Sequence, residues 1–257
     1  MSTIAMRPEV AVKPATPVPG RRFDHLFFSS MALLMLATVF LGFARTYYLA
    51  GIFRAPLPSL IIHLHGAAFT GWILLLVTQT SLVSAGRVDI HRRLGIAGFL
   101  WACLMVILGV LAATDSLVRN SGPAGRDPKF FYIIPLTDML IFATLIFLAF
   151  RFRSSPATHK RLILVGTVAL MIAAIARWPI WSHRDPITAA LTSYVFLLVL
   201  LTYDLWSTHK VHRATIWAGT FLIFVQQIRI PIGKTAAWHS FATATLSRAG
   251  YPGFVFY

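Results

Sequence analysis

The sequence predicts an all-α integral membrane protein built from about seven transmembrane helices. Of its 257 residues, 57% are hydrophobic and 12% are charged, and the mean hydropathy is +0.73, far from the balance of a soluble globular domain. A helix that crosses the hydrocarbon layer needs about 20 predominantly apolar residues. Seven runs meet this requirement, at residues 24–46, 59–82, 93–114, 132–150, 161–181, 187–206 and 214–232.

The segments outside these runs are short. Residues 1–20 contain four prolines and no apolar period, which is typical of a disordered tail. The first run is too long for a signal-peptide core, and no small-x-small cleavage site follows it, so we expect a retained helix. The transmembrane domain then covers residues 21–234. Residues 235–257 carry aromatic ends and suit a C-terminal segment that lies at the membrane interface.

Charge and cysteine content narrow the classes of function. The net charge is +15, but the cations lie at helix ends, where they meet lipid phosphates or fix topology, so we expect a lipid bilayer partner and no nucleic acid. Seven spans place thirteen of the 23 Lys and Arg residues on the N-terminal side, which predicts a cytoplasmic N-terminus. Cys103, the single cysteine, lies inside the third run, which excludes a disulfide framework and a thiolate zinc site.

An octet with a histidine, a following cation and a glycine seven residues after the histidine begins three of the runs. The copies are His91–Gly98 (HRRLGIAG), His159–Gly166 (HKRLILVG) and His212–Gly219 (HRATIWAG). Seven residues span two helical turns, so each His and its Gly share a face, where Gly leaves room for a flat or bulky group. Positive-inside anchors followed by a helix-packing glycine explain the same pattern. Both interpretations, and a proton relay without metal, remain open.

Haem explains more of the octet pattern than a bare ion does. Neutral imidazole binds haem iron, zinc and copper. His91 and His159 are the first expected pair, because their octets share His, Arg, Leu and Gly at identical offsets; His212 or His25 could replace either. Neighbouring cations would meet the propionates, and these are Arg92, Arg93, Lys160 and Arg161.

A second layer of histidines lies near the opposite ends of the helices, centred on His63-Leu64-His65-Gly66. Residues two apart point about 200° apart on a helix, so the two imidazoles do not reach one metal together. His63 shares its face with small residues, and His65 shares its face with Trp72 and Gln79. We expect His63 to bind a buried ligand and His65 to lie at its rim. A haem at His63 would lie about 20 Å from the first site, a layout for transmembrane electron transfer.

Charged residues also fall inside this outer half of the runs. Intramembrane charges normally face a partner or a cavity. We expect Asp138 to pair with Arg177, with Arg229 or Arg45 as alternative partners. The group could hold haem propionates, a quinone head or a proton path, or it could be an ion pair that orients two helices.

The chain resembles a group of bacterial multi-pass membrane proteins at His63–Gly66, Trp72, Gln79 and His91–Gly95, over about 55 residues. More distantly, residues 91–113 are similar to the His-x-x-Leu/Ile-Gly helix of cytochrome b561. That resemblance implies b-type haem with His91 as a ligand and His63, His65 or His159 as further ligands. The family's spacing of two histidines on neighbouring helices is not reproduced here, and seven helices exceed its usual plan.

These observations predict a haem b protein of the bacterial inner membrane that acts in transmembrane or quinone-linked electron transfer, with a quinone or a membrane redox complex as partner. An alternative is a non-catalytic accessory or assembly subunit of a respiratory or photosynthetic complex. A membrane metalloenzyme with a lipid-like substrate is a third possibility. Seven-helix zinc hydrolases need a His-x-x-x-His pair and gathered acids, which His209, His212 and Asp204 match poorly.

Overall fold

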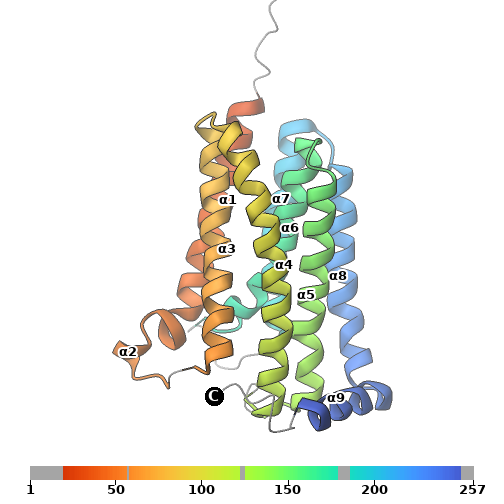
Figure 1. Ribbon diagram of the computed structural model, residues 1–257. Helices are drawn as coiled ribbons and strands as arrows, with labels where there is room; N and C mark the ends of the chain where they lie inside the picture. Colours follow the sequence, from red (N-terminus) through yellow and green to blue (C-terminus); the bar gives the residue numbers. More distant parts are fainter. Residues whose placement is uncertain (1–19, 57, 122–124, 179–185, 250–257) are drawn as a thin grey trace, which may run out of the picture.

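The computed structural model describes residues 20–56, 58–121, 125–178 and 186–249 (Figure 1). Within them it contains helices and no strand. Seven helices are long and apolar enough to cross a membrane, which confirms the predicted fold class, while the orientation of the N-terminus stays a prediction. They are α1 (Gly20–Phe43, continued by the π-helical turn η1, Ala44–Tyr48), α3 (Leu60–Ser84), α4 (Val88–Val118), α5 (Pro128–Arg151), α6 (Pro156–Ile175), α7 (Pro186–Thr208) and α8 (Arg213–Gly233).

Local sequence sets where several of these helices begin. The Ser59 side chain caps α3 by accepting from the Ile62 backbone N–H, and the Asp127 side chain caps α5 by accepting from the Lys129 N–H at 2.9 Å. Proline occupies the first helical position of both α5 and α6, where its missing N–H leaves no backbone partner unsatisfied. The Asp127 cap and both prolines lie outside the apolar runs, so α5 and α6 begin several residues before the runs predicted at 132–150 and 161–181.

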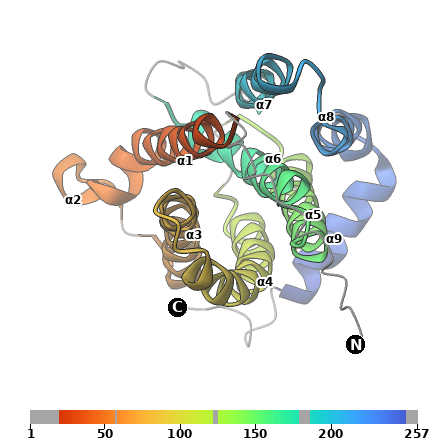
Figure 2. The same ribbon diagram turned by 90° about the horizontal axis from the view of Figure 1, so that it is seen from above.

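Five of the helices form a ring. In order around it, α1 contacts α3, α3 contacts α4, α4 contacts α5, α5 contacts α6, and α6 contacts α1 again (Figure 2). The helices α7 and α8 pack outside this ring, with α7 against α6 and α8 against α5 and α6. The helix α6 is therefore covered on several sides and is the most buried of the seven. Its close approach to α1 depends on Gly42, where a Cβ would overlap the backbone carbonyl of Ala174.

The outward faces of the bundle are apolar. Large hydrophobic side chains remain exposed along the helices, as in Leu41, Leu100, Phe147, Trp217 and Phe224. Such surface would be costly in water and is what a lipid-facing surface requires. The bilayer predicted as the protein's surroundings fits this surface.

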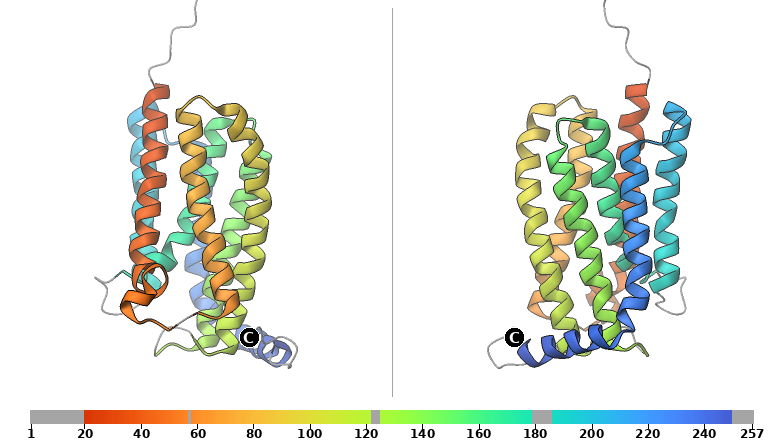
Figure 3. Two further views of the ribbon diagram at one scale, coloured as in Figure 1. Left: turned by 60° about the vertical axis from the view of Figure 1, so that its left-hand side comes forward. Right: turned by 90° about the vertical axis from the view of Figure 1, so that its right-hand side faces the viewer.

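The described part of the C-terminal segment forms α9 (Ala236–Ala249), which runs across the end of the bundle opposite the start of α1 (Figure 3). Trp238 anchors it, because its indole N–H donates to the Lys129 carbonyl at 2.7 Å and its ring lies against Tyr132. Ala242 of this helix is fully buried and packs against α4 and α5. The position across the bundle end suits the interfacial segment predicted there, while residues 1–19 and 250–257 lie outside the described part of the chain.

Candidate functional site

The structure brings His91 and His159 together at the end of the bundle where α4 and α6 begin. Each histidine is the fourth residue of its helix. The two imidazole centroids lie 6.4 Å apart and the ring planes are nearly perpendicular, at 82°. The two octets with the most shared residues therefore place their histidines side by side.

The His159 imidazole is held in one tautomer. Its Nδ1 lies 2.8 Å from the Ala149 carbonyl oxygen near the end of α5. A carbonyl only accepts hydrogen bonds, so Nδ1 carries the proton and donates it, and Nε2 keeps a free lone pair. Histidines that bind metals are oriented in the same way by an acceptor on the other ring nitrogen.

The His91 imidazole is bordered by Gln79 of α3. The Gln79 side-chain Nε2 donates to the His91 backbone carbonyl at 3.3 Å. Two polar atoms beside this contact, Gln79 Oε1 and His91 Nδ1, are buried and have no hydrogen-bond partner. Buried polar groups are normally paired with protein, water or a ligand, so these two atoms are available to bind a further hydrogen-bonding partner.

One face of α3 carries polar side chains into the ring. His65, Trp72 and Gln79 are spaced by seven residues and share this face. Trp72 lies at the middle, where its indole N–H donates to the Thr167 hydroxyl of α6 at 3.2 Å and its ring meets the edge of Phe142. His65 Nδ1 is buried without a partner. The signal for this inward face was the seven-residue spacing of side chains with polar tips.

The burial of His63 and His65 is the reverse of what we expected. His63 is exposed, and its ring lies 5.5 Å from that of Tyr47, whose hydroxyl donates to the His63 carbonyl. The small residues on the His63 face accommodate aromatic side chains of the protein itself: a Cβ at Gly66 would lie 2.9 Å from Tyr47, and one at Gly71 would lie 2.8 Å from Trp101. His63 is therefore not a buried side chain, and His65 is the inward histidine; a ligand at His63 stays a prediction.

The octet glycines pack helices. A Cβ at Gly98 would lie 3.0 Å from the Leu75 side chain, and one at Gly166 would lie 3.2 Å from Cβ of Leu145. Gly219 meets the Leu197 side chain at 3.0 Å in the same way. These glycines therefore do not line a slot for a macrocycle, and the helix-packing interpretation of their role is the better one.

The third octet differs from the other two in register. His212 precedes α8 as its capping residue, and its Nδ1 accepts from the Ala214 N–H at 3.1 Å. The ring is therefore occupied with the helix start and does not join the His91–His159 pair. Burial lowers the pKa of His212, and the Arg161 guanidinium lowers that pKa further, which favours the neutral ring that the cap needs.

Two of the four cations expected to meet propionates are already paired with acids. Lys160 forms an ion pair with Asp24 at 2.8 Å. Arg161 is only 3% exposed and binds Asp204. Arg92 and Arg93 are exposed on α4 next to His91. The assignment of Lys160 and Arg161 to a propionate site is therefore corrected, and Arg92 and Arg93 keep that prediction.

Asp204 is a buried acceptor that the sequence did not single out as a partner of Arg161. It is 0% exposed and accepts from Arg161 Nε at 3.0 Å, from the Thr215 hydroxyl at 2.6 Å and from the His212 backbone N–H at 3.1 Å. These contacts join α6, α7 and the start of α8. The network links these three helices at the end of the bundle where α6 begins.

Asp138 pairs with Arg229 rather than with Arg177. The Asp138 carboxylate and the Arg229 guanidinium are 2.6 Å apart, and both residues are buried. Arg229 also donates to the Thr137 hydroxyl at 3.2 Å. The Arg177 guanidinium lies over the Phe43 ring, 4.7 Å from its centre, and donates to the Ala173 carbonyl. Because α5 packs against both α6 and α8, helix contact alone does not select the partner: the Arg229 side chain is buried against α5, whereas the Arg177 side chain lies against Phe43 of α1.

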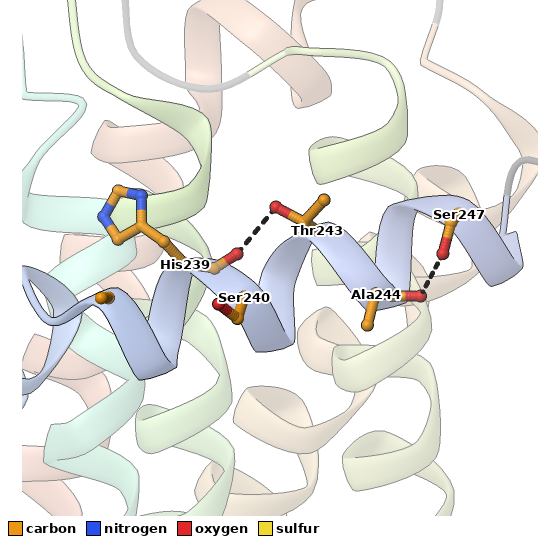
Figure 4. Close-up of a pocket in the computed structure, with 6 residues that line it drawn as sticks. His239, Ser240, Thr243, Ala244 and Ser247 are labelled. Carbon is orange, nitrogen blue, oxygen red and sulfur yellow. Dashed lines mark hydrogen bonds between the residues drawn. The ribbon is translucent and has the colours of Figure 1, made fainter.

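Neither of the two best-defined surface hollows among the described residues includes His91 or His159. One lies along α9 and is lined by Ala236, His239, Ser240, Thr243, Ala244 and Ser247 (Figure 4). The Thr243 and Ser247 hydroxyls there donate to carbonyls of their own helix. The other lies between α4 and α5. We take the His91–His159 pair as the candidate site because the two rings lie close together and a buried atom of His91 has no hydrogen-bond partner.

Metal-binding side chains do not gather in larger groups. Across the described ranges, no group of three or more His, Cys, Asp or Glu side chains is placed to hold a metal ion. The end of the bundle where α4 and α6 begin thus offers two imidazoles, an amide and exposed cations. Comparison of the chain with protein-family models, with curated proteins and with solved structures finds no match.

Proposed function

We propose that this protein is a membrane electron-transfer protein that holds one b-type haem between His91 and His159. The observation that carries the proposal is the separation of the two rings. Imidazoles that bind one metal ion from opposite sides have centroids about 6 Å apart, given metal–nitrogen bonds of about 2 Å. The observed separation is 6.4 Å. Nε2 of His159 is the nitrogen left free to bind, because Nδ1 donates to Ala149.

The number of available ligands favours haem over a bare ion. Haem brings its own four equatorial nitrogens, so two axial histidines complete the iron site. A catalytic zinc site needs three protein ligands and a structural one needs four, and the described residues bring no such group together. This count weighs against the membrane metalloenzyme alternative.

The remaining parts of the proposal concern partners and place. Bound haem would supply one-electron chemistry, and Arg92 and Arg93, exposed beside His91, would meet its propionates. We assign the protein to the bacterial inner membrane with a cytoplasmic N-terminus, and we assign electron exchange to a quinone or a membrane redox complex. The seven apolar spans support a multi-pass membrane protein; the finer assignments rest on charge distribution and on the resemblance to cytochrome b561.

A reduced-minus-oxidised absorption spectrum, with haem extraction, tests the proposal on protein purified in mild detergent from haem-replete cells. We expect a b-type signal in the wild type that is lost in His91→Ala and in His159→Ala. His63→Ala is the matched control, because His63 is exposed on the outer half of α3, and it should keep the signal.

Other outcomes redirect the proposal. Colourless wild-type protein without bound transition metal would refute it and favour the accessory-subunit alternative. A stoichiometric metal without haem would favour the metalloenzyme. A signal that survives in both His91→Ala and His159→Ala would move the haem away from this pair.

A further inference from the structure

We propose that Gln79 is the positioning residue of His91: its amide oxygen accepts the Nδ1 proton of His91 and thereby leaves Nε2 free for iron. The inference rests on the proposed haem function and adds a residue to it. It starts from two buried atoms that have no hydrogen-bond partner, Gln79 Oε1 and His91 Nδ1. Both lie at the end of the bundle where α4 begins.

The two atoms are chemically complementary. An amide oxygen only accepts, and Nδ1 of a histidine that binds metal through Nε2 only donates. The Gln79 amide is already held next to this residue, because its Nε2 donates to the His91 backbone carbonyl at 3.3 Å. That contact also fixes which end of the amide is the oxygen, since an oxygen facing a carbonyl oxygen would be repelled. The other buried unpaired side-chain atoms of the described chain belong to His65 and Gln226, on other parts of the bundle.

The Gln79 amide lies against the α4 backbone one turn after His91. Gly95 follows His91 by one helical turn, and a Cβ at Gly95 would lie 3.7 Å from Gln79 Nε2. The α3–α4 turn is short, so the last turns of α3 lie antiparallel to the first turns of α4. Gln79 and His91 therefore face each other because of the hairpin and need no distant element to bring them together.

The proposed bond makes the two histidines equivalent. His159 donates from Nδ1 to the Ala149 carbonyl, and His91 would donate from Nδ1 to the Gln79 amide. Both rings would then have the same tautomer, with Nε2 available to the same ion. A hydrogen-bonded partner of a metal-binding histidine fixes its orientation and raises its basicity, so it influences metal affinity and redox potential.

The test compares Gln79→Leu and Gln79→Glu with the wild type in the full-length protein in detergent. Haem is titrated into the haem-free protein, and the midpoint potential of the haem-loaded protein is measured. We expect Gln79→Leu to weaken haem binding by about 10–100-fold, the usual cost of losing such a partner, and to raise the midpoint potential. Gln79→Glu should lower the potential, because an anionic acceptor makes the imidazole more electron-rich.

Thr80→Val is the matched control. Its hydroxyl donates only to carbonyls of its own helix, those of Leu76 and Val77, so its affinity and potential should equal those of the wild type. Wild-type affinity and potential in Gln79→Leu would overturn the role of Gln79 and leave the haem proposal standing. A weaker Gln79→Leu together with an unchanged potential in Gln79→Glu would also overturn it, because packing alone would then explain the loss. Wild-type protein that binds no haem would reject the proposed function itself.

Discussion

Removal of the Asp204 carboxylate is expected to destabilise the bundle strongly. Asp204 is fully buried, and its loss leaves the Arg161 guanidinium, only 3% exposed, without its counterion. It also removes the acceptor of the Thr215 hydroxyl. Breaking a buried ion pair on one side costs about 3–5 kcal/mol, because a charge remains buried and uncompensated. We expect Asp204→Leu to lose a free energy of unfolding in this range.

The assay is a double-mutant cycle with Asp204→Leu, Arg161→Met and the double variant. The free energy of unfolding is measured by titration with a denaturing detergent and followed by tryptophan fluorescence. The double variant should recover most of the loss, since replacing a buried pair by apolar side chains is often close to neutral. Lys160→Met is the control, because the Lys160–Asp24 pair is partly exposed and should contribute about 0–1 kcal/mol.

The reasoning would be refuted if Asp204→Leu lost less than about 1 kcal/mol, the range of a surface pair. It would equally be refuted if the double variant were as unstable as the single one, because the loss would then come from the volume of the side chains and not from an unpaired charge.

Three further predictions test the packing and the helix cap. Gly42→Ala should lower the free energy of unfolding by about 1–3 kcal/mol, because the new Cβ overlaps the Ala174 backbone carbonyl, which does not move aside as a flexible side chain would; thermal unfolding measures it. Trp72→Phe should lose about 1 kcal/mol with its hydrogen bond to Thr167, and equilibrium unfolding measures the loss. The folded-state pKa of His212 is lowered, so the cap contributes fully to the free energy of unfolding above the unfolded-state pKa of about 6.5, and this contribution is lost as the pH falls through the folded-state pKa. Tm measured from pH 8 to pH 5 should therefore fall more in the wild type than in His212→Asn.

Each of the three has its own control. Gly51→Ala should change little beyond the ordinary helix propensity, because nothing lies within 4 Å of the new Cβ. The losses in free energy of unfolding of Trp72→Phe and Thr167→Val should add only if the two residues do not interact. A double variant that is no less stable than either single variant supports the hydrogen bond. An identical pH profile in the wild type and His212→Asn would contradict the titration of the cap.

The comparison of His63 with His65 shows where reasoning from the sequence alone goes wrong. The small residues next to His63 were interpreted as space for a ligand, and the structure fills that space with Tyr47 and Trp101 from other helices. The seven-residue spacing of His65, Trp72 and Gln79 was visible in the sequence, and it marks the face that points into the ring. In a membrane helix, side chains with polar tips at this spacing are the better indicator of the inward face than small residues.

The octets were partly informative for a similar reason. Shared offsets predicted that His91 and His159 correspond, and the structure places both in the fourth position of their helices and side by side. His212 lies at the same distance from its glycine, but it precedes the first residue of α8 and caps the helix instead of lying in its first turn. A motif defined by spacing alone does not fix its position relative to the start of the helix.

The sequence by itself determined the seven spans and the correspondence of His91 with His159. Spans follow from composition because the bilayer requires long apolar runs, and the correspondence of the two histidines follows from their shared offsets. The tertiary structure decided which face of each helix points inward and which charges pair. Lipid and protein core are both apolar, so hydropathy does not distinguish the two faces of a membrane helix. Asp138 could meet Arg177 or Arg229 by sequence position, and only the direction of the two side chains decided between them: Arg229 is buried against Asp138, whereas Arg177 lies over Phe43.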